Sequence, residues 1–150
     1  MRLFDTLTGQ EQEFKSPDGK VKLYVCGITP YAPCHMGHAM SYVIFDTLVR
    51  YLEFLGYEVD HVQNFTDIDD KIIERSAQEG VAPIDLAEKY IQQFYTDMDS
   101  LNIRRAKVYP RATHEIPEII GIINSLISKG YAYVSDNSVY YRVSMKKDYG

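Results

Sequence analysis

The sequence lacks long apolar runs and has no excess of positive charge. No hydrophobic stretch approaches the roughly 20 residues that cross a bilayer, and the first residues do not form the apolar segment of a signal peptide. The 150 residues carry a formal net charge of -5, so no global positive field draws the chain onto a nucleic-acid backbone. We therefore expect a cytoplasmic protein that makes no contact with a membrane.

Cysteine is also scarce, because the chain has only Cys26 and Cys34. A chain of this size in a reducing compartment needs no disulfide, so free thiols or a metal ligand are the better interpretations. The two residues do not have the short spacing of a zinc motif, and spacing alone predicts no zinc site. Taken by itself, Cys26 is compatible with a zinc ligand, a nucleophile or a small buried hydrophobe.

The residues that are present suit a globular protein with a substantial core. Hydrophobic residues make up 45% of the chain and charged residues 25%. The length fits one ordinary domain, or half of a nucleotide-binding domain followed by the start of an insertion. No repeat or low-complexity tract interrupts the pattern, and we expect the chain to end inside a larger fold.

Strand-like and helix-like segments alternate along the sequence. A strand, a helix and another strand in this order predict a right-handed parallel crossover, which is the unit of a doubly wound α/β sheet. Apolar spacing in the first long helix predicts one buried face, formed by Val43, Ile44, Leu48, Leu52 and Leu55. The predicted elements are a hairpin before residue 19, strands over 21–26 and 57–65, helices over 37–55, 68–78, 83–101 and 113–129, and a hairpin over 131–143.

The tetrad His35, Met36, Gly37 and His38 lies between the first strand and the first long helix, where open parallel sheets bind their ligands. Glycine permits close approach of a nucleotide, and the helix N-terminus offers free N–H groups to phosphates. The two imidazoles can donate hydrogen bonds to phosphate oxygens as charge builds on them. A chance tetrad, with one histidine as a cap and the other on the surface, is the alternative. The position of the tetrad favours a nucleotide site.

A second polar segment follows the second strand and opens the next helix. Thr66 or Asp67 can cap this helix, and acidic residues suit the positive end of the helix dipole. Because the carboxyl ends of parallel strands meet at one edge, Thr66 is expected on the ligand side of the sheet. We weigh binding and capping equally for Thr66, and favour capping for Asp69 and Asp70.

Several of these segments together resemble the N-terminal portion of the cysteinyl-tRNA synthetases, which are class I aminoacyl-tRNA synthetases. They span most of the chain in the order expected for that family, and together they are far more specific than the histidine tetrad. The matching segments are residues 4–8 (FDTLT), 23–27 (LYVCG), 35–38 (HMGH), 50–52 (RYL), 63–73 (QNFTDIDDKII) and 110–114 (PRATH).

The resemblance implies a zinc site that recognises the amino acid. It implies that Cys26 is one ligand of an active-site Zn²⁺, and that Gly27 and Thr66 contact the bound cysteine. Thiolates bind zinc well, and an open fourth position can take the sulfur of the substrate. Serine is a poorer ligand, so binding alone can reject it without an editing site. The other zinc ligands and the second signature loop lie further along in that family, so we expect weak zinc and ATP binding by this chain alone.

The resemblance also implies the reaction and its partners. His35, Gly37 and His38 would form the ATP signature, with His35 and His38 stabilising the reacting phosphates of ATP bound with Mg²⁺. The enzyme would convert cysteine to cysteinyl-adenylate and transfer it to tRNA(Cys), which is held mainly by regions beyond this chain. The expected fold is α/β, a Rossmann-like parallel sheet forming the first half of a class I synthetase catalytic domain. Residues 1–101 would belong to that half, and residues 102–150 would begin an inserted connective α+β segment.

Three other functions remain open at this point. The segment from residue 26 to 31 also resembles the ligase that joins cysteine to an amino-sugar inositol in mycothiol synthesis, although residues 70–73 and 111–114 favour the synthetase. A nucleotidylyltransferase also uses a histidine tetrad of this type, but it needs neither Cys26 nor the segment 64–73. A non-catalytic nucleotide-binding module would keep the fold without turnover.

Overall fold

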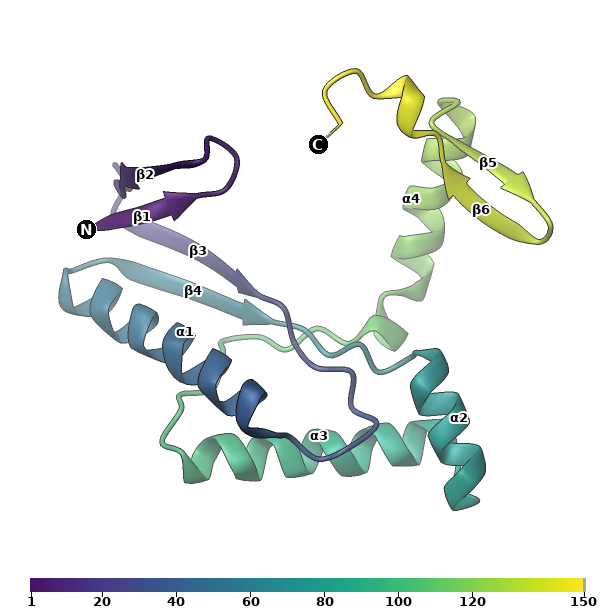
Figure 1. Cartoon of the computed structure of the whole chain (residues 1–150), viewed down its shortest axis with the longest axis horizontal. Helices are drawn as coiled ribbons and strands as arrows, with labels where there is room; N and C mark the ends of the chain where they lie inside the picture. Colours follow the sequence, from purple (N-terminus) through teal and green to yellow (C-terminus); the bar gives the residue numbers. More distant parts are fainter. Residues whose placement is uncertain (150) are drawn as a thin grey trace.

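Two parallel strands form the centre of the computed structural model, which describes residues 1–149. Strand β3 (Lys20–Val25) pairs with β4 (Glu58–Gln63), and helix α1 (Met36–Phe54) connects them (Figure 1). The parallel strand-helix-strand unit predicted from the sequence is therefore confirmed. The expected end of the connective segment at Gly150 lies outside the described residues.

A third segment runs parallel to β4, although the sequence pattern did not predict a strand there. Residues 107–112 form isolated parallel bridges to β4 and to the residues that follow it. The N–H of Gln63 donates to the carbonyl of Val108 at 3.1 Å, and the N–H of Phe65 donates to that of Pro110 at 2.8 Å. Because Pro110 has no N–H to donate, the pairing consists of isolated bridges and not of a continuous ladder. It is part of the sheet that carries β3 and β4.

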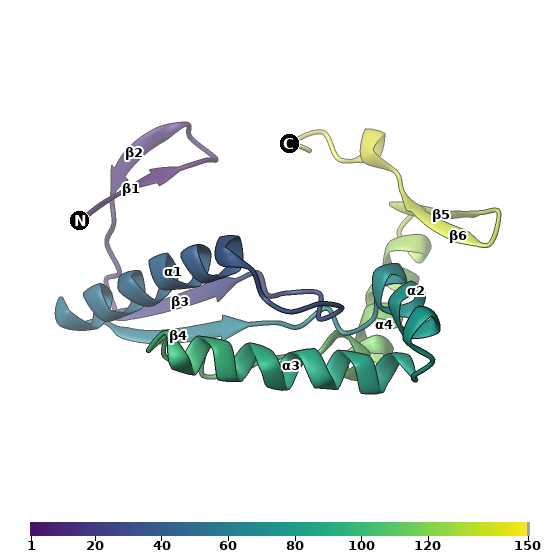
Figure 2. The same ribbon diagram turned by 60° about the horizontal axis from the view of Figure 1, so that its bottom comes forward.

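Helices α1 and α3 (Pro83–Ser100) cover one face of the sheet. Figure 2 shows both helices running alongside β3 and β4. The rings of Tyr42 in α1 and Phe94 in α3 meet edge to face, with their centroids 5.5 Å apart. The buried core beneath these helices consists of Val25, Ile28, Tyr42, Phe65, Ile91, Phe94 and Met98.

The buried face of α1 differs from the predicted one. Tyr42, Val49 and Leu52 are the buried residues of this helix, whereas Val43 and Ile44 are exposed. The prediction failed because α1 is apolar around most of its circumference, so that periodicity alone could not select the side that meets the sheet. Of the five residues in the predicted face, Leu52 is fully buried, and Val43, Ile44 and Leu55 are exposed.

Helix α2 (Asp70–Glu79) begins three residues after Asp67 and packs against α3 through a small second core. The buried residues of this second core are Ile72, Leu86, Ala87 and Tyr90. Asp69 is the N-cap, because its carboxylate accepts from the N–H of Lys71 at 2.9 Å. The expectation that Thr66 or Asp67 caps this helix is therefore wrong, and capping by Asp69 is confirmed. Asp70 lies in the first turn and is not the cap, so the favoured capping by Asp70 is wrong.

The first hairpin forms a separate two-stranded sheet, which stands apart from β3 and β4 in Figure 2. It consists of antiparallel strands β1 (Arg2–Asp5) and β2 (Gln10–Glu13). Phe14 contacts the main body at the end of this hairpin, where its ring meets that of Tyr57 with centroids 5.8 Å apart. The hairpin predicted before residue 19 is confirmed.

The end of the chain forms a helix and a second hairpin. Helix α4 (Ile116–Ser128) follows a short 3-10 turn, η1 (Ala112–His114), so that it begins three residues later than predicted because Pro117 sets its first turn. Strands β5 (Ala132–Ser135) and β6 (Ser138–Tyr141) form the predicted hairpin, and a 3-10 turn, η2 (Val143–Met145), follows them. Within residues 1–149, no helix combines the length and apolarity that crossing a membrane requires.

Candidate active site

The predicted site residues gather at the carboxyl edge of the sheet. Cys26 and Gly27 directly follow β3, and Thr66 lies three residues beyond the end of β4. The N–H of Thr66 donates to the carbonyl of Ile28 at 3.0 Å, which joins the two strand extensions after the strands have ended. Open parallel sheets bind ligands at this edge, at the start of the following helix.

His35 and His38 form a reciprocal cap at the first turn of α1. Nδ1 of His35 accepts from the N–H of Gly37 at 3.1 Å, and Nδ1 of His38 accepts from the N–H of His35 at 3.2 Å. The two rings are stacked, with centroids 3.9 Å apart and an interplanar angle of 17°. Both histidines therefore have a structural role in starting the helix, where the sequence suggested that one of them at most would be a cap.

This cap fixes which nitrogen of each ring carries a proton. A nitrogen that accepts a hydrogen bond has no hydrogen, so a neutral ring in this arrangement keeps its proton on Nε2. Burial, followed by the nearby charge of His35, lowers the pKa of His38 and favours its neutral form. The capped histidines thus leave two Nε2–H groups to donate to a ligand.

Gly37 packs closely against the His35 ring. A Cβ atom added to Gly37 would lie 3.0–3.1 Å from two atoms of that ring. The N–H of Gly37 donates to the cap. A helix N-terminus normally offers free backbone N–H groups to an anion, and here the imidazoles take the place of some of those donors.

The two cysteines lie in different environments, and both are free thiols. Cys26 is exposed, and its carbonyl accepts from the hydroxyl of Tyr42 in α1 at 3.4 Å. Cys34 packs against the core, and burial, followed by the charge of Asp97, raises its pKa to about 11. Cys34 is therefore a protonated thiol at neutral pH, whereas Cys26 is accessible to a ligand.

Gly27 passes unusually close to the backbone that follows β4. A Cβ atom at Gly27 would lie 1.5 Å from the carbonyl oxygen of Asn64, so only glycine fits. The N–H of Gly27 donates to Oδ1 of Asn64 at 2.8 Å, and Nδ2 of Asn64 lies 3.5 Å from Oγ1 of Thr66. The sequence pattern did not mark Asn64 as a site residue. An amide side chain directly after the second parallel strand was the available signal.

Asp67 joins the site edge to the segment that follows the third parallel strand. Its carboxylate is buried and accepts from both the N–H and the hydroxyl of Thr113, at 2.9 and 2.7 Å. Nearby, Arg111 forms an ion pair with Glu88 of α3 at 2.6 Å. The contacts of Asp67 fix the residue that follows Thr66 without using the hydroxyl of Thr66.

The described residues do not form a complete metal site. Within residues 1–149, no three histidine, cysteine, aspartate or glutamate side chains are grouped so that they could hold a metal ion. A structural or catalytic zinc ion takes three or four protein ligands. Cys26 has the chemistry and exposure of one thiolate ligand.

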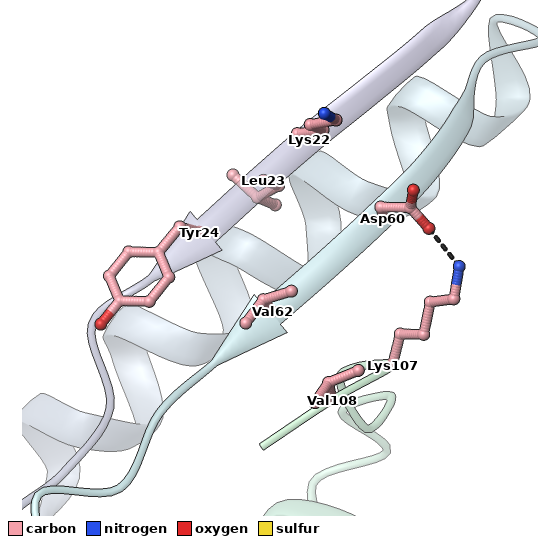
Figure 3. Close-up of a pocket in the computed structure, with 7 residues that line it drawn as sticks. All are labelled: Lys22, Leu23, Tyr24, Asp60, Val62, Lys107 and Val108. Carbon is pink, nitrogen blue, oxygen red and sulfur yellow. Dashed lines mark hydrogen bonds and ion pairs between the residues drawn. The ribbon is translucent and has the colours of Figure 1, made fainter. Parts of the chain in front are cut away.

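A hollow of about 430 Å³ lies away from this edge, on the sheet face that α1 and α3 do not cover. Figure 3 shows Lys22 and Tyr24 of β3 on one side and Val108 of the third segment on the other, with Asp60 paired to Lys107. None of the predicted site residues lines this hollow. It marks an uncovered sheet face and is separate from the candidate active site.

Sequence comparisons identify relatives of the whole chain. The family described as tRNA synthetases class I (C) catalytic domain matches residues 12–150. The cysteine-tRNA ligase of Caldicellulosiruptor saccharolyticus is 51% identical, and the alignment covers 100% of this chain and 32% of the relative. Proteins of the same name from Lactobacillus delbrueckii subsp. bulgaricus and Dehalococcoides mccartyi are 53% and 52% identical and are covered to 32% and 33%. The chain spans about a third of the length of these curated relatives.

The fold comparison agrees with the sequence comparisons. The solved structure of Mycobacterium tuberculosis methionyl-tRNA synthetase in complex with methionyl-adenylate is similar, with a TM-score of 0.62 and 20% identity. The similarity covers 81% of this chain and 29% of that one, and it confirms the class I catalytic-domain fold predicted from the sequence. With the family match over residues 12–150, these findings show that the chain belongs to the class I (C) tRNA synthetase catalytic domain family.

Proposed function

We propose that this chain is the N-terminal catalytic portion of a cysteine-tRNA ligase. Such an enzyme activates cysteine with ATP to form cysteinyl-adenylate and then transfers the cysteine to tRNA(Cys). The observation that carries this proposal is an identity of 51–53% to cysteine-tRNA ligases across 100% of the chain. The clustering of Cys26, Gly27 and Thr66 at the carboxyl edge of the sheet is consistent with it.

In this proposal, ATP with Mg²⁺ binds at the first turn of α1. The Nε2–H groups of His35 and His38 donate to phosphate oxygens, and Gly37 allows the ligand to approach the helix. Catalysis then rests on positioning and on stabilising the charge that develops at the α-phosphate. Because His38 is held neutral by its partly buried position, its ring donates at Nε2 while its Nδ1 keeps the cap.

Cysteine recognition is assigned to Gly27, Thr66 and a zinc ion held in part by Cys26. When bound, Zn²⁺ would supply an open coordination position for the sulfur of the substrate. Cys26 fits the part of one thiolate ligand, and the remaining ligands would come from outside this chain. Cytoplasmic location and binding of tRNA(Cys), mainly by other regions, complete the proposal.

The decisive experiment replaces Cys26 in the full-length protein. We expect Cys26→Ser to abolish cysteine-dependent ATP-pyrophosphate exchange and to release the bound zinc, because a hydroxyl is a much weaker zinc ligand than a thiolate. Cys34→Ser is the matched control, and it should retain both exchange and zinc. Cysteine-dependent exchange that survives Cys26→Ser would contradict the zinc assignment. A wild-type protein with no cysteine-dependent exchange would contradict the proposed function itself.

A further inference from the structure

The side chain of Asn64 bridges the point where β3 and β4 separate. Both strands have ended at this point, and the N–H of Gly27 donates to the amide oxygen of Asn64 at 2.8 Å. One step further on, the N–H of Thr66 donates to the carbonyl of Ile28 at 3.0 Å. The Asn64 side chain therefore takes the place of a main-chain hydrogen bond between the two strand extensions. It lies between Gly27 and Thr66, the two residues assigned to cysteine binding.

The orientation of this amide is set by Gly27. A backbone N–H can only donate, so the group that faces Gly27 must be the oxygen of Asn64 and cannot be its NH₂. The two backbones are in close contact at this point, because a Cβ atom at Gly27 would lie 1.5 Å from the carbonyl oxygen of Asn64. The NH₂ group of Asn64 is consequently directed to the other side, where Oγ1 of Thr66 lies 3.5 Å away.

This orientation decides the direction of hydrogen bonding at Thr66. The NH₂ group of Asn64 can only donate, so the hydroxyl oxygen of Thr66 is the acceptor in that contact. The hydroxyl proton then remains available for an acceptor on the ligand side. The carboxylate and the thiolate of cysteine are acceptors of this kind, whereas its ammonium group is not.

We infer that Asn64 is a positioning residue that holds the hydroxyl of Thr66 as a hydrogen-bond donor toward the amino-acid substrate. This inference rests on the proposed function, because it names the residue that orients one of the proposed cysteine contacts. Asn64 acts through Thr66 and Gly27 and is assigned no contact with the substrate. Its role is therefore seen in the affinity for cysteine and not in the binding of ATP.

The test uses the isosteric substitution Asn64→Asp in the full-length protein. Aspartate keeps an acceptor for Gly27 but removes the donor, so that Thr66 turns its proton inward to the new carboxylate. We expect the KM for cysteine in pyrophosphate exchange to rise roughly tenfold to a hundredfold, the range for losing a hydrogen bond to a charged group. The KM for ATP should change by less than about threefold, since the histidine cap is unaffected.

A double-mutant cycle with Thr66→Val separates action through Thr66 from an independent effect. When the hydroxyl is already absent, adding Asn64→Asp should raise the KM for cysteine much less than it does in the wild type. Thr66→Ser is the conservative variant and should keep most of the affinity. Two results would overturn the inference. In the first, the KM increases of the two single variants multiply in the double variant. In the second, Asn64→Asp leaves the KM for cysteine unchanged while Thr66→Val raises it.

A spectroscopic measurement covers the case in which Asn64→Asp does not fold. In the full-length protein with labelled asparagine, the side-chain NH₂ resonances of Asn64 should shift in Thr66→Val and remain near their original positions in Thr66→Ser. An NH₂ signal that is insensitive to Thr66→Val would overturn the inference. This readout needs no turnover, so it also distinguishes failure of the inference from failure of the proposed function, which is seen as absent cysteine-dependent exchange by the wild type.

Discussion

At the scale of single residues, the site depends on a glycine that leaves no room for a side chain. The nearest atom to a Cβ built on Gly27 is the backbone oxygen of Asn64 at 1.5 Å, and backbone atoms cannot swing away as a flexible side chain can. We predict that Gly27→Ala destabilises the chain by about 3 kcal/mol, at the upper end of the usual cost of overpacking. Chemical denaturation followed by circular dichroism measures this change.

Gly121 provides the matched control for this substitution. It lies in α4, and a Cβ atom there meets no other atom within 4 Å. Because alanine is a better helix former than glycine, Gly121→Ala should be neutral or stabilising by roughly 0.5–1 kcal/mol. Equal destabilisation by Gly27→Ala and Gly121→Ala would show that the close approach at Gly27 does not exist in solution.

The stacked histidines give a prediction about pH. Burial first, and the charge of His35 second, lower the pKa of His38 below its ordinary value of 6.5. The unfolded chain therefore binds this proton more tightly, so the contribution of His38 to stability is present above pH 6.5 and is lost as pH falls through the folded pKa. Protonation also removes the Nδ1 acceptor that caps His35. An NMR titration should give a His38 midpoint below 6.5, and a midpoint above that value would contradict the prediction.

At the scale of elements, α2 starts where a single carboxylate caps it. Asp69 accepts from the N–H of Lys71 at 2.9 Å, so Asp69→Ala should cost about 1 kcal/mol of the free energy of unfolding. Asp69→Asn keeps the acceptor and should lower the free energy of unfolding by only a few tenths of the loss caused by Asp69→Ala. Thermal denaturation compares the two variants. Equal losses in both would mean that the charge, and not the cap, supports the helix.

The order of strands and helices was predictable from the sequence, and the buried face of α1 was not. Strong local signals marked the boundaries, such as Gly56, which follows α1 with a φ of 90°, and Pro83, which opens α3. The choice of face depends on tertiary packing. Tyr42 is buried because it meets Phe94 of α3, a contact between residues far apart in the sequence. No spacing rule along α1 contains that information.

The candidate site was predictable to a similar extent. Motif residues such as Cys26, His35 and Thr66 could be chosen from the sequence, and the parallel crossover placed them at one edge. The roles of Asn64, Asp67 and the third parallel segment were not predictable. They arise from hydrogen bonds across the sheet, such as that from Thr113 to Asp67, which depend on strand register and not on local sequence. The contacts of Cys26, His35 and Thr66 with ligands remain predictions.

At the scale of the whole molecule, residues 1–149 cover one face of the sheet and leave the other uncovered. Parallel sheets are normally buried on both faces, because crossover helices pack on each side. Here Tyr24 is 61% exposed beside the hollow of about 430 Å³, and Val108 is exposed on the other side of that hollow. The chain spans about a third of the length of its curated relatives, so a longer polypeptide has ample residues to cover this face.

We therefore predict that this uncovered face binds a hydrophobic dye in the 150-residue chain and loses that binding in the full-length protein. Tyr24→Thr removes an aromatic ring from the face but keeps a residue that favours strands, so it should lower dye fluorescence. Tyr149→Thr is the matched control, because Tyr149 is 62% exposed but lies against Tyr141, away from the hollow. In the full-length protein neither variant should change the signal. Equal effects of the two variants in the short chain would place the dye elsewhere, and undiminished binding by the full-length protein would show that this face stays open.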